Sequence, residues 1–337
     1  MLTEQIKSKV FEYLKDLTKT DDWDVINSGI EARQSVVYRL VSQQYPSELA
    51  LKVYKTKSSA PIKLQYDSLE NFHLKNKNKK FRIPKPYGLF KEDGFYIMEW
   101  VYGEPLSKIL WKNCFFKGPL QKNILRSYEW LNNYHSHANL NIKEIDFSKY
   151  SRSIELSLEK CGSQSFFNEN PLFKHSFETL KAFESNFVGY ETYHADLHGD
   201  LNLGNIIIDD NSVIGIDIGA RLHLPVQNDI AQMLTHICTN YFLMLPRSAM
   251  REDISTWDIF NVVLDAYKYS DDKKARDFFL FVFLHQLIQR WITTHYYNKE
   301  NKNSAFTYHV PLGKWRMYNC SVIIEGITKV INERYLK

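Results

Sequence analysis

A short segment between residues 198 and 219 carries oxygen-bearing side chains at a spacing suited to phosphoryl transfer. It reads HGDLNLGN over residues 198–205 and ends in DIG over residues 217–219. Transfer to a hydroxyl requires a carboxylate beside that hydroxyl, and oxygen ligands for the Mg²⁺ that bridges the phosphates of ATP. We therefore expect Asp200 to be the catalytic base and Asn205 and Asp217 to bind Mg²⁺.

The residues between Asn205 and Asp217 predict how these two expected ligands, twelve positions apart in the chain, come together. Two apolar runs, III and VIGI, flank the sequence DDNS at residues 209–212. Short apolar runs joined by a cluster of Asp, Asn and Ser are typical of two strands and a turn. The pattern predicts a hairpin that returns Asp217 to the vicinity of Asn205.

The elements that must position this segment follow from the rest of the chain. Alternating or β-branched runs predict strands at residues 36–41, 48–54 and 95–101, with a helix at residues 62–74 between the second and third. Helical periodicity dominates after residue 105. The chain therefore reads as a sheet-containing first part followed by a mostly helical second part.

Composition and charge restrict the class of protein. The 337 residues suggest two domains or one large bilobal unit, and 44% hydrophobic with 24% charged residues is typical of a soluble globular protein. A formal charge of +4 indicates neither nucleic-acid binding nor a membrane surface. No apolar run is long enough to span a membrane. Residues 1–17 predict an amphipathic helix rather than a signal peptide, and four scattered cysteines favour a reducing compartment, so we expect a cytoplasmic protein without membrane insertion.

Together these motifs resemble the aminoglycoside phosphotransferase and choline kinase group of the protein-kinase-like fold. Segment 198–219 resembles that group's catalytic motif, LALKVYK at residues 49–55 resembles its lysine-bearing strand, and MEWVYGEPL at residues 98–106 resembles its linker. The resemblance implies an α+β bilobal fold. A small lobe at residues 1–100 would hold a five-stranded antiparallel sheet and one internal helix, and a larger, mostly helical lobe would follow at residues 101–337.

The same resemblance implies ATP as co-substrate and supplies its expected contacts. A phosphate loop would lie at residues 26–35, although its single glycine also fits an ordinary turn. Lys52 would hold the phosphates, and the linker would hold adenine. The residues expected to bind the nucleotide are Ser28, Gly29, Ser35, Lys52, Met98, Glu99 and Val101.

Several positions refine this expectation. The helix residue that should pair with Lys52 is Gln65 rather than glutamate, with Asp67 or Glu70 as possible substitutes. His198 is expected to anchor the catalytic loop through a hydrogen bond. Asp229 is expected to brace that loop, and the preceding Asn228 to cap a helix. A second His-x-Asp at residues 194–196 lacks an Asn five residues later, so Asp200 is taken as the base.

The acceptor is expected to be a hydroxyl of a small molecule. Only residues 220–228 separate the DIG triplet from Asp229, and Asn202 stands where kinases of Ser or Thr carry Lys. A sugar, an aminoglycoside, a nucleoside or an amino alcohol all remain open. Residues 253–272 and 286–297 offer aromatic and acidic side chains for that pocket. The alternatives are a nucleotide-binding pseudokinase module and an atypical protein kinase.

Overall fold

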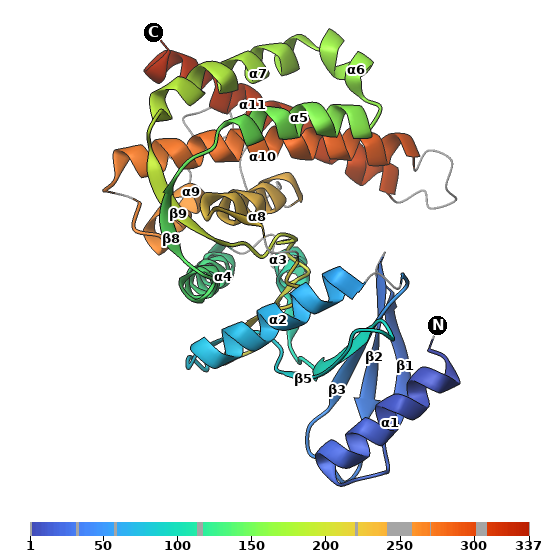
Figure 1. Cartoon of the computed structure of the whole chain (residues 1–337). Coiled ribbons are helices and arrows are strands. Elements are labelled where there is room, and N and C mark those ends of the chain that lie inside the picture. Colours follow the sequence, from blue (N-terminus) through green and yellow to red (C-terminus); the bar gives the residue numbers. More distant parts are fainter. Residues whose placement is uncertain are drawn as a thin grey trace. The chain divides into compact units, whose positions relative to one another are not determined.

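Figure 1 shows the computed structural model of the whole chain. The chain divides into two compact units. The structure describes residues 2–31, 34–56, 59–112, 117–219, 222–240, 258–269, 271–300 and 309–336. The first unit comprises Met1–Pro105, His198–Asp200 and Asn205–Leu222, and the second comprises Leu106–Leu197, Leu201–Gly204 and His223–Lys337.

The first unit is built on an antiparallel sheet of five strands in the order β1-β2-β3-β6-β5. This sheet confirms the predicted number of strands and their antiparallel pairing, and α2 supplies the expected internal helix. The elements of this unit are α1 (Glu4–Thr18), β1 (Asp24–Glu31), β2 (Ser35–Val41), β3 (Leu49–Tyr54), α2 (Ser59–Lys75), β4 (Phe81–Arg82), β5 (Pro86–Phe90), β6 (Phe95–Glu99), β7 (Glu104–Pro105), β10 (Ile206–Ile208) and β11 (Val213–Gly215).

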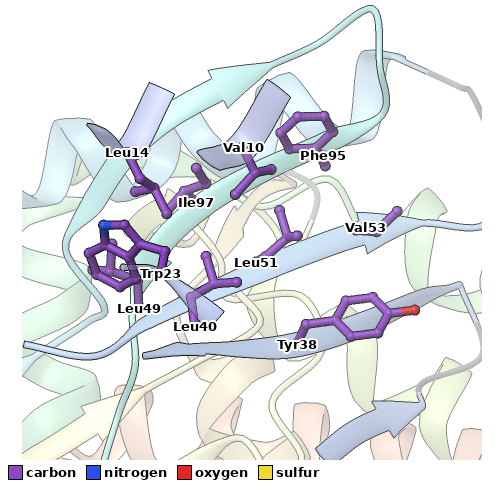
Figure 2. Packing of buried hydrophobic residues seen from close by; sticks show 10 residues of the cluster. All are labelled: Val10, Leu14, Trp23, Tyr38, Leu40, Leu49, Leu51, Val53, Phe95 and Ile97. Carbon is purple, nitrogen blue, oxygen red and sulfur yellow. The ribbon is translucent and has the colours of Figure 1, made fainter. Parts of the chain in front are cut away.

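Helix α1 covers one face of the five-stranded sheet. Its buried residues Val10 and Leu14 pack against apolar side chains of β2, β3 and β6 (Figure 2). The strand residues in this cluster are Tyr38, Leu40, Leu49, Leu51, Val53, Phe95 and Ile97. Helix α1 buries an apolar face and leaves a polar face outside, so the predicted amphipathic helix is confirmed. The apolar face fixes the helix to the sheet.

The opposite face of this sheet carries Lys52. In the register of the sheet, Lys52 lies beside Val37 of β2 and Tyr96 of β6. Side chains alternate between the two faces of a strand, so these three residues share a face. Their chain neighbours, such as Leu51 and Ile97, lie in the cluster with α1. Helix α1 therefore covers the face of the sheet opposite Lys52.

A second sheet of the first unit contains the predicted hairpin. Strands β10 and β11 pair antiparallel, with Ile207 opposite Ile214, which confirms the hairpin. Pro105 of β7 pairs with β10, and β4 runs parallel to β11. These pairings make the hairpin part of the first unit, so this unit contains residues beyond the predicted lobe 1–100.

The second unit is mostly helical. Its elements are α3 (Leu106–Lys112), α4 (Lys117–His137), β8 (Asn141–Glu144), α5 (Ser148–Lys160), α6 (Gln164–Glu169), α7 (Pro171–Glu184), the 3₁₀ turn η1 (Ser185–Phe187), β9 (Glu191–Asp196), β12 (His223–Pro225), α8 (Gln227–Asn240), α9 (Asp258–Ala266), α10 (Lys273–Glu300) and α11 (His309–Tyr335). Figure 1 shows α10 in orange, and this helix packs against α5, α7, α8 and α11. Its run of aromatic and aliphatic residues from Phe278 to Leu284 is buried, which explains the central place of α10.

Three details differ from the sequence prediction. The strand expected at residues 95–101 ends at Glu99, and residues 24–31, partly assigned to a phosphate loop, form β1. Helix α8 begins at Gln227, so Asn228 lies in its first turn and is not the cap. No helix among the described residues is long and apolar enough to cross a membrane.

Candidate active site

Lys52 is a buried cation with a carboxylate partner. Its side chain is 3% exposed, and its Nζ atom contacts the Asp217 carboxylate. The same Nζ atom donates to the Gln65 side-chain oxygen at 3.1 Å. A buried ammonium group is costly unless it is paired and hydrogen-bonded. The pairing with Asp217 therefore accounts for the burial of Lys52.

Two tyrosines surround Lys52 on the same face. The Nζ atom lies 5.4 Å from the ring centroid of Tyr54 and 5.9 Å from that of Tyr96. Both phenol groups donate to the Gln65 side-chain oxygen, Tyr96 at 3.3 Å. Burial is the main cause that raises the pKa of both tyrosines above the ordinary phenol value, so they remain neutral donors. The rings contribute cation–π attraction as well.

Gln65 therefore occupies the position that the sequence assigned to it and is the α2 partner of Lys52. Its single side-chain oxygen accepts from Lys52, Tyr54 and Tyr96. The acidic residues considered as substitutes lie elsewhere on the helix, where Asp67 is half-buried and Glu70 is exposed. Neither tyrosine was predicted. Strand alternation places Tyr54 on the face of Lys52, and that signal was available in the sequence.

Asp217 follows β11 in a left-handed backbone conformation, with φ of 60°. This region is sparsely populated by residues other than glycine, and such conformations concentrate at functional sites. Gly219 then approaches the catalytic loop, where its N–H donates to the His198 carbonyl oxygen at 2.6 Å. A Cβ atom at Gly219 would lie 2.9 Å from that oxygen, so glycine permits the contact.

Hydrogen bonds fasten residues 198–205, the predicted catalytic loop, to the hairpin of β10 and β11. The fully buried His198 contacts the Ile216 carbonyl oxygen through Nε2 at 2.9 Å, which confirms its anchoring role. Asn205 donates from Nδ2 to the Asp200 carbonyl oxygen at 2.8 Å, and its own carbonyl accepts from the Ile216 N–H. Asp200 itself is exposed. The loop is thus fixed while the Asp200 carboxylate faces solvent.

Asn205 and Asp217 fit a magnesium ion by their chemistry. Because Nδ2 of Asn205 is engaged with the Asp200 carbonyl, its side-chain oxygen is left as the available ligand atom. Asp217 is 36% exposed and presents a carboxylate. No group of three or more His, Cys, Asp or Glu suited to a metal occurs in the described part of the chain. Two oxygen ligands nevertheless suit Mg²⁺, which commonly takes its remaining ligands from water and phosphate.

The predicted adenine linker has a mixed hydrogen-bond pattern. The Glu99 N–H donates to the Lys85 carbonyl at 2.8 Å, and the Trp100 N–H donates to the Glu48 carbonyl at 3.1 Å. The Glu99 carboxylate pairs with Arg82. Met98 and Val101 are half-buried. The Glu99 side chain thus has a structural partner of its own.

The predicted phosphate loop includes part of β1. Ser28 and Gly29 lie between Ile26 and Ile30, where the pairing of β1 with β2 shifts register. Ser35 is the first residue of β2, lies opposite Tyr54 and is 4% exposed. The structure therefore places Ser35 on the face of Lys52 with little of its side chain exposed.

In the second unit, α8 contacts the remainder of the catalytic loop. The Leu201 N–H donates to the Gln232 side-chain oxygen at 3.3 Å, so a residue that the sequence did not single out braces the loop. Asp229 lies 3.1 Å from Nε2 of His135, and both are buried. Asp196 is bound by Asn139 and His223. These contacts give the Asp196 carboxylate structural partners of its own.

Comparisons with known proteins establish the fold. No protein-family model matches the chain, and no curated protein matches it. An ethanolamine kinase of Plasmodium vivax has 14% sequence identity and a TM-score of 0.55, covering 94% of this chain and 88% of its own. A spectinomycin phosphotransferase, solved with ADP and spectinomycin, has 12% identity and a TM-score of 0.53, covering 96% and 98%.

A choline/ethanolamine kinase family protein from Mesorhizobium loti has 10% identity and a TM-score of 0.59, covering 99% of this chain and all of its own. At these identities the likeness concerns the fold. It confirms the kinase-like α+β fold, with an antiparallel sheet in the first part and helices in the second, that the motifs predicted.

Proposed function

We propose that this protein is an ATP- and Mg²⁺-dependent phosphotransferase that moves the γ-phosphate of ATP to a hydroxyl of a small molecule. The observation that carries the proposal is the contact between buried Lys52 and Asp217, which has left-handed backbone. A buried cation, a carboxylate and local backbone strain in one place are typical of catalytic sites. The ordered motif at residues 198–219 surrounds the same carboxylate.

In this proposal Lys52 and the linker bind the nucleotide. The Lys52 ammonium, preorganised by Gln65 and the two tyrosines, donates to phosphate oxygens of ATP. Ser28, Gly29 and Ser35 add donors from the β1–β2 hairpin. Among the described residues no hydrogen bond occupies the Val101 N–H, in contrast to those of Glu99 and Trp100. That N–H is therefore available to the adenine edge, with Met98 beside it.

Asp217 and Asn205 would hold the metal. Mg²⁺, when bound, neutralises charge on the phosphates and fixes their orientation. With an ion present, the Asp217 carboxylate would be shared between the metal and Lys52, and the Lys52 ammonium would be available to the phosphates. Asn205 keeps its bond to the Asp200 carbonyl and so couples the position of the metal ligand to that of the base.

Asp200 would orient the acceptor hydroxyl and accept its proton. Its carboxylate is exposed, so an acceptor can approach it, while its backbone is held by Asn205. The neighbouring Gly199 has φ of 79°, a conformation that glycine adopts without strain. The loop can therefore present the carboxylate at a sharp bend.

The short connection between the DIG triplet and α8 supports a small-molecule acceptor. Solved structures with a similar fold also support a small-molecule acceptor, because two of them are named as an ethanolamine kinase and a spectinomycin phosphotransferase. No nucleic-acid or membrane partner enters the proposal, and a cytoplasmic location accords with its use of ATP.

A screen of hydroxyl-bearing metabolites for ATP-dependent gain of one phosphate by mass spectrometry tests the proposal. Asp200→Asn keeps the shape and removes the base, so kcat should fall by roughly 10² to 10⁴. Binding of Mg-ATP, measured by calorimetry, should stay near that of the native protein.

Asp196→Asn is the matched control because it lies in the other His-x-Asp, and this variant should keep most of the turnover. Loss of activity in the control alone would place the base at Asp196. Transfer to generic protein substrates only would favour an atypical protein kinase. ATP binding without transfer to any acceptor would favour the pseudokinase alternative.

A further inference from the structure

The Lys52 face of the five-stranded sheet carries an arginine at its linker end. Arg39 of β2 lies opposite Ala50 of β3, and Ala50 lies opposite Met98 of β6. This row is two residues along the strands from the row of Lys52. It therefore lies on the same face, roughly 7 Å nearer the linker.

The guanidinium group of Arg39 is held by a carboxylate of the neighbouring strand region. Nε contacts one side-chain oxygen of Glu48, and Nη2 contacts the other. The two side chains are 30% and 25% exposed. The hydrogen bond with Arg39 is the main cause that lowers the pKa of Glu48, so the carboxylate is ionised at neutral pH. A two-pronged bond of this kind fixes the plane of the guanidinium group.

The residues on both sides of Val101 contact this guanidinium group. Nη2 of Arg39 donates to the Tyr102 hydroxyl at 3.2 Å. Its Cζ atom lies 5.5 Å from the ring centroid of Trp100 and 5.7 Å from that of Tyr102, which adds cation–π attraction. The Trp100 N–H donates to the Glu48 carbonyl at 3.1 Å. The linker around Val101 is thus fixed to one arginine–glutamate pair.

The following residues of the linker are fixed to the hairpin of β10 and β11. Gly103 has φ of 131°, and a Cβ atom there would lie 2.8 Å from the Ile208 carbonyl oxygen, so glycine permits the approach. Glu104 then pairs with Ile208 in the second sheet. The linker is therefore held on both sides of Val101 within the first unit, and Arg39 holds it on the side of the five-stranded sheet.

We propose that Arg39 is a positioning residue for the purine base of the nucleotide, because it holds Trp100 and Tyr102 and so fixes the Val101 N–H between them. This inference rests on the proposed phosphotransferase function, in which that N–H meets the adenine edge. A donor that is ordered before binding loses less conformational freedom when the ligand arrives. Arg39 thereby acts on the base, whereas Lys52 acts on the phosphates.

Calorimetry with the parts of the nucleotide tests this division. Adenosine probes the base alone, Mg²⁺-tripolyphosphate probes the phosphates alone, and Mg-ADP probes both. In Arg39→Met the affinity for adenosine and for ADP should fall about tenfold, the equivalent of one hydrogen bond to a charged group. The affinity for tripolyphosphate should stay at the native value. In steady-state kinetics KM for ATP should rise, while kcat stays near native.

Three further variants make the test specific. Arg39→Lys keeps the charge and loses the planar fork, so it should recover only part of the adenosine affinity. If Arg39→Met does not fold, Tyr102→Ala asks the same question from a side chain that is 56% exposed, and it should weaken adenosine and leave tripolyphosphate unchanged. Lys9→Met is the control, because Lys9 pairs with Asp93 at 2.7 Å away from the linker, and it should bind all three ligands normally.

The outcomes separate this inference from the phosphotransferase proposal. Equal weakening of adenosine and tripolyphosphate in Arg39→Met would indicate a general structural role and overturn the positioning role. Native affinity for adenosine and ADP in Arg39→Met and Tyr102→Ala would also overturn it and leave the phosphotransferase proposal standing. A native protein that binds neither ADP nor adenosine would reject the phosphotransferase proposal, and this inference with it.

Discussion

Two cations of this protein, buried Lys52 and half-buried Arg290, have very different surroundings. Lys52 in the first unit has a carboxylate, an amide oxygen and two aromatic rings around its ammonium group. Arg290 in the second unit lies near another arginine, and its Nε atom has no partner in the described part of the chain. The first cation is compensated by the fold itself.

The difference teaches how the Lys52 site can respond to binding. At Lys52, an incoming phosphate must compete with Asp217, so binding rearranges an existing ion pair. The four variants below test the contrast.

The largest expected effect comes from Asp217→Ala. This variant removes the proposed metal ligand and leaves buried Lys52 without its counter-charge. We expect turnover with Mg-ATP to fall by roughly 10³ or more, because electrostatic stabilisers of developing charge have effects of that order. Steady-state kinetics at ordinary Mg²⁺ concentrations provide the measurement. Asp210→Ala changes an exposed carboxylate of the same hairpin and should keep near-native turnover; equal losses in both would remove Asp217 from the site.

Acid titration of stability reports on His236 of α8, whose pKa is lowered by burial first and then by the charges of Arg290 and Arg316. The pKa of His236 is about 3 in the folded protein, against about 6.5 in an unfolded chain. Between these values the unfolded state binds a proton that the folded state does not, so stability is lost as pH falls below about 6.5. The slope due to this group is about 1.4 kcal/mol per pH unit. Denaturant unfolding at several pH values should show a flatter acid limb in His236→Gln.

Exposed His175→Gln on α7 serves as the control and should follow the native profile. An unchanged slope in His236→Gln would contradict the burial of a neutral imidazole beside the arginines.

Gln65→Leu tests whether the Gln65 oxygen orients Lys52. This substitution leaves Lys52, Tyr54 and Tyr96 without their shared acceptor, so we expect kcat/KM for ATP to fall about tenfold, the value of roughly one lost hydrogen bond to a charged group. Gln65→Glu restores an oxygen acceptor and should remain within a few fold of the native value. If Gln65→Leu were fully active, the oxygen of Gln65 would not be required to orient Lys52.

The smallest expected effect distinguishes the two cations by stability alone. Arg290→Met removes a charge that is repelled by Arg316, so the free energy of unfolding should rise by up to about 1 kcal/mol. Lys52→Met removes a cation from favourable partners and should lower it. Lys273→Met controls for loss of an exposed charge on α10. A loss of several kcal/mol in Arg290→Met would indicate a strong internal partner and contradict the contrast.

Sequence patterns identified the parts of the site that lie close together in the chain. The hairpin at β10 and β11 follows from two apolar runs and a turn, and it brings Asp217 back to the loop of Asn205 and His198. Composition and periodicity likewise indicated the sheet and the helical region. Exact strand ends differed because the final residues of a strand depend on which neighbour pairs with them.

The amino-acid sequence by itself determined the hairpin and placed beside it the residues proposed as base and metal ligands, because turn and strand preferences act over a few residues. Only the tertiary structure decided which residues surround the two cations. Lys52 meets Asp217 across 165 positions of the chain, and α10, which carries Arg290, packs against α8 and α11. No periodicity encodes such neighbours, because they arise when separately formed helices and strands pack and exclude water from the groups between them.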